Sequence, residues 1–371
     1  MLEVYDTTLR DGEQAPFMEM TPKQKLALAF KLRDLGVNVI EAGFPISNSD
    51  DNRAIIEIAK HVKGVTISAL ARAKKEDIDC AASALEEADD AMLHVFLPVS
   101  NLHMKEKLGK TQAEIYEFAC DSITYGKSLV GKVIFGAEDA TRADPEFLKE
   151  LMKGVEKAGA ETFVIADTVG YAQPEELPHL INYLNSIARK IKLGVHCHND
   201  LGQAVSNTLM AIKYGVTHVQ TTLCGIGERA GNASFEQVIL ALESRPDYYR
   251  AEHSIKLRKM IEASEYCADL VGLCLPKTQP LLGDNVLSHG SGIHQDGIIK
   301  ESQTYEIFDP KIFGKKRSIV WGKHSGTKGI KYAQSHSPKK DFKSRLASIK
   351  RNQNRLAVYK RKVQVLQHNI L

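Results

Sequence analysis

The stretch Ile-Lys-Leu-Gly-Val-His-Cys-His-Asn-Asp, residues 191–200, contains the pattern on which the fold of this chain depends. A short apolar run ends in several polar residues, and amphipathic stretches of helical period flank it at 174–190 and 203–215. A buried parallel strand between two helices has this pattern. The segment therefore predicts one strand–helix unit of an α/β fold.

The same unit recurs along the first 245 residues. Runs expected to form strands lie at 2–6, 37–43, 64–69, 91–97, 131–137, 161–167, 191–197 and 216–222. Helical patterns lie at 21–36, 50–62, 74–88, 111–129, 144–159, 174–190, 203–215 and 234–244. Eight such units predict a (β/α)8 TIM barrel. A doubly wound open sheet is the alternative, but the glycine-rich turn expected after its first strand is missing.

The repeat stops near residue 275, which divides the chain into three predicted parts. Residues 1–275 are expected to form the barrel, and residues 276–337 a small, mostly helical linker and lid subdomain. Residues 338–371 predict a basic helical tail, with ten Lys or Arg and a single acid. Such a charge run is typical of a solvated helix, so contact with nucleic acid or an acidic partner is the less favoured interpretation.

Composition excludes several classes of protein. The chain has 371 residues, of which 43% are hydrophobic and 26% charged, values that are ordinary for a globular protein. No window approaches the roughly 18 apolar residues of a membrane helix. The N-terminal residues lack the apolar segment of a signal peptide, and the six cysteines form no C-x-x-C pair. We therefore expect a cytoplasmic protein without membrane contact or a disulfide scaffold.

Polar residues gather where the predicted strands end. In a (β/α)8 barrel, the active site lies at the carboxyl ends of the strands. The residues at these positions are Asp6, Arg10, Asp11, Glu41, His94, Glu138, Asp139, Asp167, Thr168, His196 and His198. Their recurrence at one end of the strands predicts a common site there.

His196 and His198 give the clearest sign of chemistry. Positions i and i+2 of a strand share a face, so both imidazoles can reach one ion. A carboxylate from another strand end, either Asp11 or Asp200, would complete a set suited to Zn²⁺, Mn²⁺ or Mg²⁺. The alternative is a polar barrel mouth without an ion. Cys197 points to the opposite side.

Arg10 stands beside one of the candidate metal ligands. A guanidinium next to a bound carbonyl group can stabilise a developing alkoxide. Alternatively, Arg10 and Asp11 form an ion pair that only holds the first loop in place. The sequence leaves both interpretations open.

Three longer motifs resemble one family of enzymes. They are Asp6-Thr-Thr-Leu-Arg-Asp-Gly-Glu-Gln14, His196-Cys-His-Asn-Asp-Leu-Gly202 and Gly225-Ile-Gly-Glu-Arg-Ala-Gly-Asn-Ala233. In this order they resemble the Claisen-condensing metal-dependent barrels, which include 2-isopropylmalate, homocitrate and citramalate synthases and, more distantly, 3-hydroxy-3-methylglutaryl-CoA lyase. The resemblance runs from residue 1 to about 330. It implies an acyltransferase that condenses acetyl-CoA with a 2-oxo acid and releases CoA.

The resemblance also implies a metal centre. Asp11, His196 and His198 match the metal ligands of the family, and Asn232 matches the asparagine that completes the site. The ion would be Mn²⁺, Mg²⁺ or Zn²⁺. Arg10 matches the arginine that polarises the keto oxygen, in agreement with one of the two interpretations above.

Other residues match the substrate site and the lid of the family. Glu138 and Thr168 match residues around the 2-oxo acid, and we expect His94 to join them. His294 and Tyr305 match a lid histidine and tyrosine that reach the active site of a partner subunit, which implies a homodimer with swapped lids. His294 is the first candidate for the base that removes a proton from acetyl-CoA.

The motifs divide between two possible oxo acids. Ser291–Gly297 resembles isopropylmalate synthase, whereas Gly136–Asp144 resembles homocitrate synthase of the nitrogen-fixation type. Some homocitrate synthases carry an arginine where this chain has Ile134, which favours an apolar substrate, although Arg72 or His103 could supply a cation instead. We predict condensation with 2-oxoisovalerate to give 2-isopropylmalate for leucine biosynthesis. Homocitrate synthesis from 2-oxoglutarate is the alternative, and a non-catalytic barrel with a binding or regulatory role a more remote one.

Overall fold

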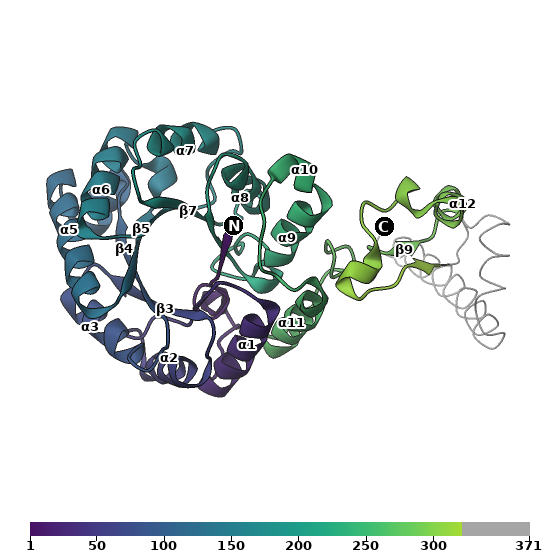
Figure 1. The fold of residues 1–371 in the computed structure, drawn as a ribbon, viewed down its shortest axis with the longest axis horizontal. Helices are drawn as coiled ribbons and strands as arrows, with labels where there is room; N and C mark the ends of the chain where they lie inside the picture. Colours follow the sequence, from purple (N-terminus) through teal and green to yellow (C-terminus); the bar gives the residue numbers. More distant parts are fainter. Residues whose placement is uncertain (321–371) are drawn as a thin grey trace, which may run out of the picture. The chain divides into compact units, whose positions relative to one another are not determined.

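Eight parallel strands in the first part of the chain close into a barrel, with neighbours in the order β1 to β8. A ring of helices surrounds the barrel (Figure 1). The predicted (β/α)8 TIM barrel is therefore confirmed, and the open sheet is excluded because β1 also pairs with β8. The computed structural model describes residues 1–320, so the predicted basic tail, 338–371, lies outside the described residues.

Each strand lies within three residues of its predicted bounds. The strands are β1 (Glu3–Asp6), β2 (Val39–Glu41), β3 (Thr66–Arg72), β4 (Ala91–Pro98), β5 (Lys132–Glu138), β6 (Thr162–Asp167), β7 (Lys192–Cys197) and β8 (His218–Thr221). The main helices are α1 (Pro22–Leu35), α2 (Ser49–His61), α3 (Lys75–Ala84), α5 (Gln112–Leu129), α6 (Pro145–Ala158), α7 (Leu177–Asn185), α8 (Ala204–Lys213), α9 (Phe235–Ser244) and α11 (Leu257–Leu270). Apolar runs locate the strands because both faces of a parallel barrel strand are buried.

Helices α3 and α7 are shorter than predicted. The pattern at 174–190 predicts a helix throughout, but residues 174–176 form a turn and α7 ends at Asn185. Beyond it, Glu156 Oε1 accepts hydrogen bonds from the backbone N–H groups of Lys190 at 2.5 Å and Ile191 at 2.9 Å. These bonds direct the chain into β7 instead of prolonging the helix.

Capping residues fix helix ends at the places that the sequence predicted. Thr21 and Gln24 form a capping box at the start of α1, and the Asp144 side chain caps α6. Both helices end at a glycine in the left-handed conformation, Gly36 with φ of 94° and Gly159 with φ of 109°. The polar loops between helices and strands are therefore set by local sequence.

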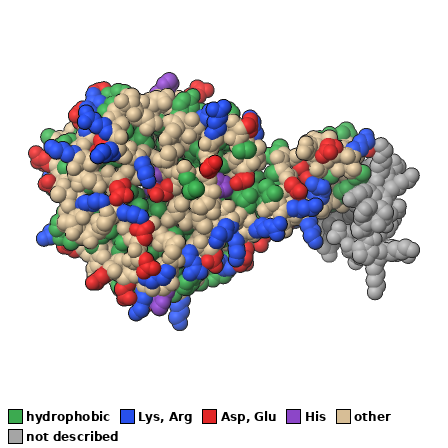
Figure 2. Space-filling view, in the orientation of Figure 1, with side chains coloured by type: hydrophobic (Ala, Val, Ile, Leu, Met, Phe, Trp, Pro, Cys, Tyr) green, Lys and Arg blue, Asp and Glu red, His purple; other side chains and the backbone are tan. Residues whose placement is uncertain are grey.

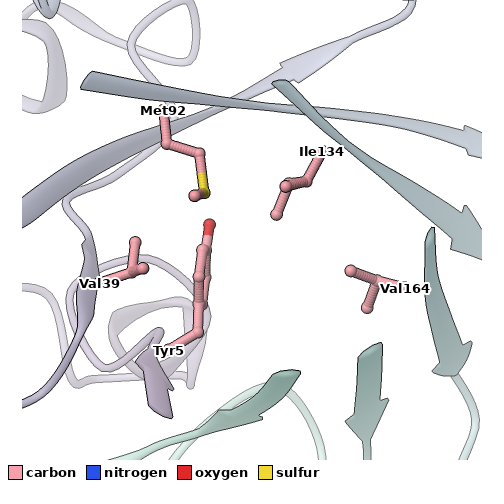
Figure 3. Packing of buried hydrophobic residues seen from close by; sticks show 5 residues of the cluster. All are labelled: Tyr5, Val39, Met92, Ile134 and Val164. Carbon is pink, nitrogen blue, oxygen red and sulfur yellow. The ribbon is translucent and has the colours of Figure 1, made fainter. Parts of the chain in front are cut away.

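Side chains from five strands fill the middle of the barrel. They are Tyr5, Val39, Met92, Ile134 and Val164, none of them more than 3% exposed, and Figure 3 shows them pointing into the same space. Two residues further along a strand, the side chain returns to the same face. The inward positions there are polar or small, namely Glu41, His94, Gly136 and Ala166. An apolar layer thus lies directly beneath the carboxyl end of the barrel.

The chain divides into two compact units, the first spanning Met1–Gly283 and the second beginning at Asp284. Residues 276–283, which we predicted to belong to the linker, are thus part of the barrel unit. The described part of the second unit contains short elements, namely β9 (Ser288–His289), α12 (Gly292–Lys300), η5 (Ser302–Thr304), η6 (Pro310–Phe313) and β10 (Ser318–Ile319). Strands β9 and β10 pair in parallel.

The surface and the cysteines agree with the composition. Acidic and basic side chains are interspersed over the face of the barrel unit that Figure 2 shows. All six cysteines lie among the described residues, and all are free thiols. Within residues 1–320, no helix is both long enough and apolar enough to cross a bilayer.

Candidate active site

Three buried side chains converge at the carboxyl end of the barrel. His196 lies on β7 and His198 directly after it, and their Nε2 atoms are 3.2 Å apart. Oδ2 of Asp11, from the loop after β1, lies 3.6 Å from the first of these nitrogens and 3.8 Å from the second. The three donor atoms lie within 4.8 Å of one another, so this group could hold a metal ion.

The choice between the two candidate carboxylates is settled by their partners. Asp200 forms a two-point ion pair with Arg229, at 2.8 and 2.9 Å, and does not belong to the converging group. Asp11 faces the histidines instead. The predicted ligand set with Asp11 is the one that the structure brings together.

Protonation favours metal binding at this group. Burial lowers the pKa of His196 to about 3 and also lowers the pKa of His198, so both imidazoles are neutral near pH 7. A neutral imidazole is the form that binds a metal. Burial opposes ionisation of Asp11, but Arg10, together with the neighbouring imidazoles and the hydrogen bond from Asn232, outweighs it and keeps the pKa of this carboxyl well below its usual value.

Asn232 supplies a further oxygen at the same place. An isolated bridge pairs its backbone with that of His198, and its Nδ2 donates to Asp11 Oδ1 at 2.7 Å. Its Oδ1 is buried and has no hydrogen-bond partner among the described residues. Two imidazole nitrogens, a carboxylate and an unpartnered amide oxygen fit a divalent cation.

Glu41 organises the cluster next to the metal ligands. It ends β2, is fully buried, and accepts hydrogen bonds from Thr7 Oγ1 at 2.5 Å and Arg10 Nε at 2.7 Å. Its other oxygen accepts from Tyr5 OH at 2.8 Å and lies 2.7 Å from His94 Nδ1. Burial opposes its ionisation, but Arg10 and His94 hold its pKa well below the usual value.

Arg10 is a fixed cation between two acids. Its Nη1 lies 2.6 Å from Asp11 Oδ2, and its Nε lies 2.7 Å from Glu41 Oε2. The predicted ion pair with Asp11 is thus present. Nη2 has no hydrogen-bond partner within residues 1–320, which leaves donors for a bound molecule. The structural and chemical interpretations of Arg10 are therefore compatible.

A cavity of about 390 Å³ opens over this cluster. Seven of the residues predicted for the site line it, namely Arg10, Asp11, His94, Glu138, Thr168, His196 and His198. Glu138 Oε1 accepts from Lys107 Nζ at 2.7 Å, and Thr168 Oγ1 accepts from the backbone N–H of Asp139 at 2.9 Å. His94 Nε2 and Glu138 Oε2 are buried without a partner among the described residues.

The cations that line this cavity are already paired. Arg10 lies between Asp11 and Glu41, Lys107 binds Glu138, and Arg229 binds Asp200. Among the described residues, each lining Lys or Arg thus already has a carboxylate partner, so the second carboxylate of a dicarboxylic substrate would meet no cation without one. Aromatic and aliphatic side chains cover the remaining wall, namely Phe44, Leu70, Phe96, Val164 and Ala166.

Ile134 lies too deep in the barrel to contact a bound oxo acid. Ile134 is fully buried in the apolar layer and does not line the cavity. The β5 residues that do are Gly136 and Glu138, and an added Cβ at Gly136 would lie 2.6 Å from His94 Nε2. The sequence alone could not say which of these inward positions face the substrate.

His294 and Tyr305 both lie in the second unit. Their rings stack with centroids 4.0 Å apart and an interplanar angle of 18°. The tyrosine is 42% exposed. Their role at the active site of a partner subunit stays a prediction.

The chain matches known families over most of its length. Residues 1–267 match the HMGL-like family, and residues 281–358 match the homocitrate synthase post-HMGL domain-like family. The 2-isopropylmalate synthase of Pyrococcus furiosus is 46% identical over 329 residues, which cover 88% of this chain and 66% of that protein. The chain therefore spans just under two thirds of that relative.

A shorter relative is covered more fully. The 2-isopropylmalate synthase 1 of Caldanaerobacter subterraneus subsp. tengcongensis is 45% identical over 327 residues, or 87% of this chain and 82% of that protein. Among solved structures, the HMG-CoA lyase of Bacillus subtilis superposes with a TM-score of 0.64 at 20% identity, over 74% of this chain and 95% of that one. The solved structures thus agree on the barrel fold.

Proposed function

Because this chain belongs to the HMGL-like family, we propose that it is an acyltransferase that condenses acetyl-CoA with a 2-oxo acid and releases CoA. The observation that carries the proposal is the convergence of Asp11, His196 and His198 beside Arg10, at the floor of one cavity. The similarity to 2-isopropylmalate synthases supports the same reaction.

The metal ligands and Arg10 would share the work at the ketone. A divalent ion held by Asp11, His196, His198 and Asn232 would act as a Lewis acid toward the ketone and carboxylate of the oxo acid. Arg10, a permanent cation with a free donor, would stabilise the alkoxide that forms there. Mn²⁺, Mg²⁺ and Zn²⁺ all suit this mixed nitrogen and oxygen set.

The remaining roles follow from the cavity and from the resemblance. Glu138, Thr168 and His94 would contact the oxo acid. His294 would remove a methyl proton from acetyl-CoA, and Tyr305, stacked on its ring, would orient it. The carbanion attacks the keto carbon to form the new carbon–carbon bond, the alkoxide takes up a proton, and water then cleaves the thioester and frees CoA.

We propose 2-oxoisovalerate as the oxo acid and 2-isopropylmalate, an intermediate of leucine biosynthesis, as the product. The paired cations and the apolar wall of Phe44, Leu70 and Phe96 suit a branched aliphatic side chain. Homocitrate synthesis from 2-oxoglutarate is the second candidate, because residues 281–358 match the homocitrate synthase type of domain.

We propose further that the protein forms a homodimer with swapped lids. A homodimer would bring the second unit of one protomer, with His294 and Tyr305, to the active site of its partner. We propose that the enzyme works in the cytoplasm. Thiol release by mixtures of an Arg10→Ala and a His294→Ala variant tests the swapped lid, since mixed dimers should regain part of the activity that each variant lacks alone.

Thiol release from acetyl-CoA tests the function. The purified, Mn²⁺-loaded protein is assayed in parallel with 2-oxoisovalerate, 2-oxoglutarate and pyruvate. We expect turnover with 2-oxoisovalerate, loss of turnover on chelation and its recovery when Mn²⁺ is restored. Preference for 2-oxoglutarate would support homocitrate synthesis. No thiol release with any of the three acids would support the non-catalytic barrel.

A further inference from the structure

A second cavity of about 360 Å³ lies beside the first in the barrel unit. Its walls come from the ends of β3 and β4, the start of α5 and the π-helical turn η2 (Met104–Leu108). The proposed reaction makes no use of this space, and of the residues considered for the site only Glu138, in the wall between the two cavities, and Arg72 line it. A volume of about 300–1,000 Å³ is the usual size of a small-molecule site.

The rim of the second cavity is basic. Its four cations are Arg72, Lys74, Lys107 and Lys110. Three of them are paired with acids: Arg72 with Asp77 at 2.6 Å, Lys107 with Glu138 at 2.7 Å and Lys110 with Glu114 at 3.1 Å. Lys74 is exposed and makes no ion pair with another described residue. The rim and its partners therefore carry one positive charge in excess.

The interior of the second cavity is apolar. Leu97, Leu108, Ile115 and Phe118 line it, and Phe96 lines both this cavity and the catalytic one. An apolar pocket with one uncompensated cation at its edge fits a ligand with one negative charge and a hydrocarbon body. We propose that this second cavity binds a small aliphatic monocarboxylate.

The position of Lys107 couples this site to the catalytic cavity. Phe96, Lys107 and Glu138 line both spaces. The Lys107 side chain is 54% exposed and stands on a π-helical turn, a distortion that is frequent at functional sites. A carboxylate in the second cavity competes with Glu138 for the Lys107 ammonium group, and so changes the charge that Glu138 presents to the oxo acid. This coupling rests on the proposed function, whereas the binding itself does not.

Isothermal titration calorimetry of the Mn²⁺-loaded protein tests the binding. The probes are 4-methylpentanoate and its neutral analogue 4-methylpentan-1-ol. We expect the carboxylate to bind at least about tenfold more tightly than the alcohol, and Lys74→Glu to weaken its binding about tenfold. Lys75→Glu is the matched control, because Lys75 is exposed and adjacent but does not line the cavity. Its effect on the affinity should be clearly smaller than that of Lys74→Glu.

The outcomes separate this proposal from its alternatives. Equal affinity for acid and alcohol, equal effects of the two lysine variants, or no heat up to about 10 mM probe would each overturn it. Loss of probe binding at saturating acetyl-CoA would also overturn it, by assigning the space to the acyl donor. The assay with 2-oxoisovalerate then tests the coupling: 4-methylpentanoate should raise its KM in the wild type and not in Lys74→Glu. A protein that binds the probe but shows no turnover would contradict the proposed function and still support the binding site in the second cavity.

Discussion

Two layers of inward-pointing side chains in the same barrel differ in polarity and charge. The lower layer packs Val39, Met92 and Ile134 with less than 5% exposure, and none of these side chains carries a charge. Two residues further along the same strands stand Glu41, His94 and Gly136. The layers are separated by about 7 Å, the rise of two strand residues. The apolar layer stabilises the barrel. The polar layer holds a cluster of charges, and the packed strands beneath it keep these side chains in position.

The largest expected effect comes from the metal ligands. His196→Ala should lower kcat/KM at least about 10³-fold, because a bound cation supplies several kcal/mol of transition-state stabilisation. The unfolding midpoint should change little, since this imidazole packs in the polar layer. Metal content and steady-state kinetics measure the effect. His61→Ala, on the exposed surface of α2, is the control, and a variant that keeps its metal would contradict the assignment.

Glu41 is a residue of the polar layer whose substitution should lower stability as well as activity. Glu41→Gln leaves the buried Arg10 and His94 without their carboxylate, and breaking a buried pair costs about 3–5 kcal/mol. We therefore expect both lower stability and lower activity, measured by urea unfolding and thiol release. Glu57→Gln on the exposed face of α2 serves for comparison. Full activity at full stability would show that Glu41 is replaceable.

Ile134, in the apolar layer, should affect stability but not the choice of substrate. Ile134→Val should cost about 0.5–1.5 kcal/mol of unfolding free energy, the usual penalty for removing one buried methylene. The KM for either oxo acid should stay within about twofold, because Ile134 does not line the cavity. A changed ratio of 2-oxoisovalerate to 2-oxoglutarate turnover would restore Ile134 as a specificity residue.

Asp6 gives the smallest expected effect. It follows Tyr5 on β1, and burial, together with Glu236 and Glu41, raises its pKa to about 7 against the contacts with Thr8. Since the folded state then holds a proton that the unfolded state releases, stability falls as the pH rises toward and past 7. Between pH 6 and 8 the loss should be about 1 kcal/mol. Urea unfolding at both pH values measures it, and Asp6→Asn should flatten the difference.

The fold was predictable because local and global patterns agree. Buried parallel strands are continuous apolar runs, and the caps at Thr21 and Asp144 mark helix starts in the sequence itself. Spacing alone predicted a shared ligand pair only at His196 and His198, whereas the other site residues were predicted from their places at strand ends and from the family resemblance. The choice of Asp11 over Asp200 depends on Arg229, which is distant in sequence and captures Asp200.

The sequence placed Glu41 at the predicted site but gave no sign that it organises the cluster. A glutamate that ends the apolar run Val39-Ile40-Glu41 must find several partners when buried. Which partners it finds depends on the closure of the barrel, which brings Tyr5 and His94 to it from β1 and β4. For the same reason, the sequence could not separate Ile134 from Gly136 as the position that faces the cavity.

The net charge of the polar layer bears on the order in which a metal ion and an anionic substrate would bind. Arg10 contributes one positive charge, Asp11 and Glu41 contribute two negative ones, and the histidines are neutral, so 1 − 2 leaves the cluster at −1. Such a cluster attracts a divalent cation and repels the carboxylate of an oxo acid. With the cation bound, the sum becomes +1, which a 2-oxo monocarboxylate neutralises. Under the proposed function, this charge balance would favour ordered binding, with the metal first and the anionic substrate second.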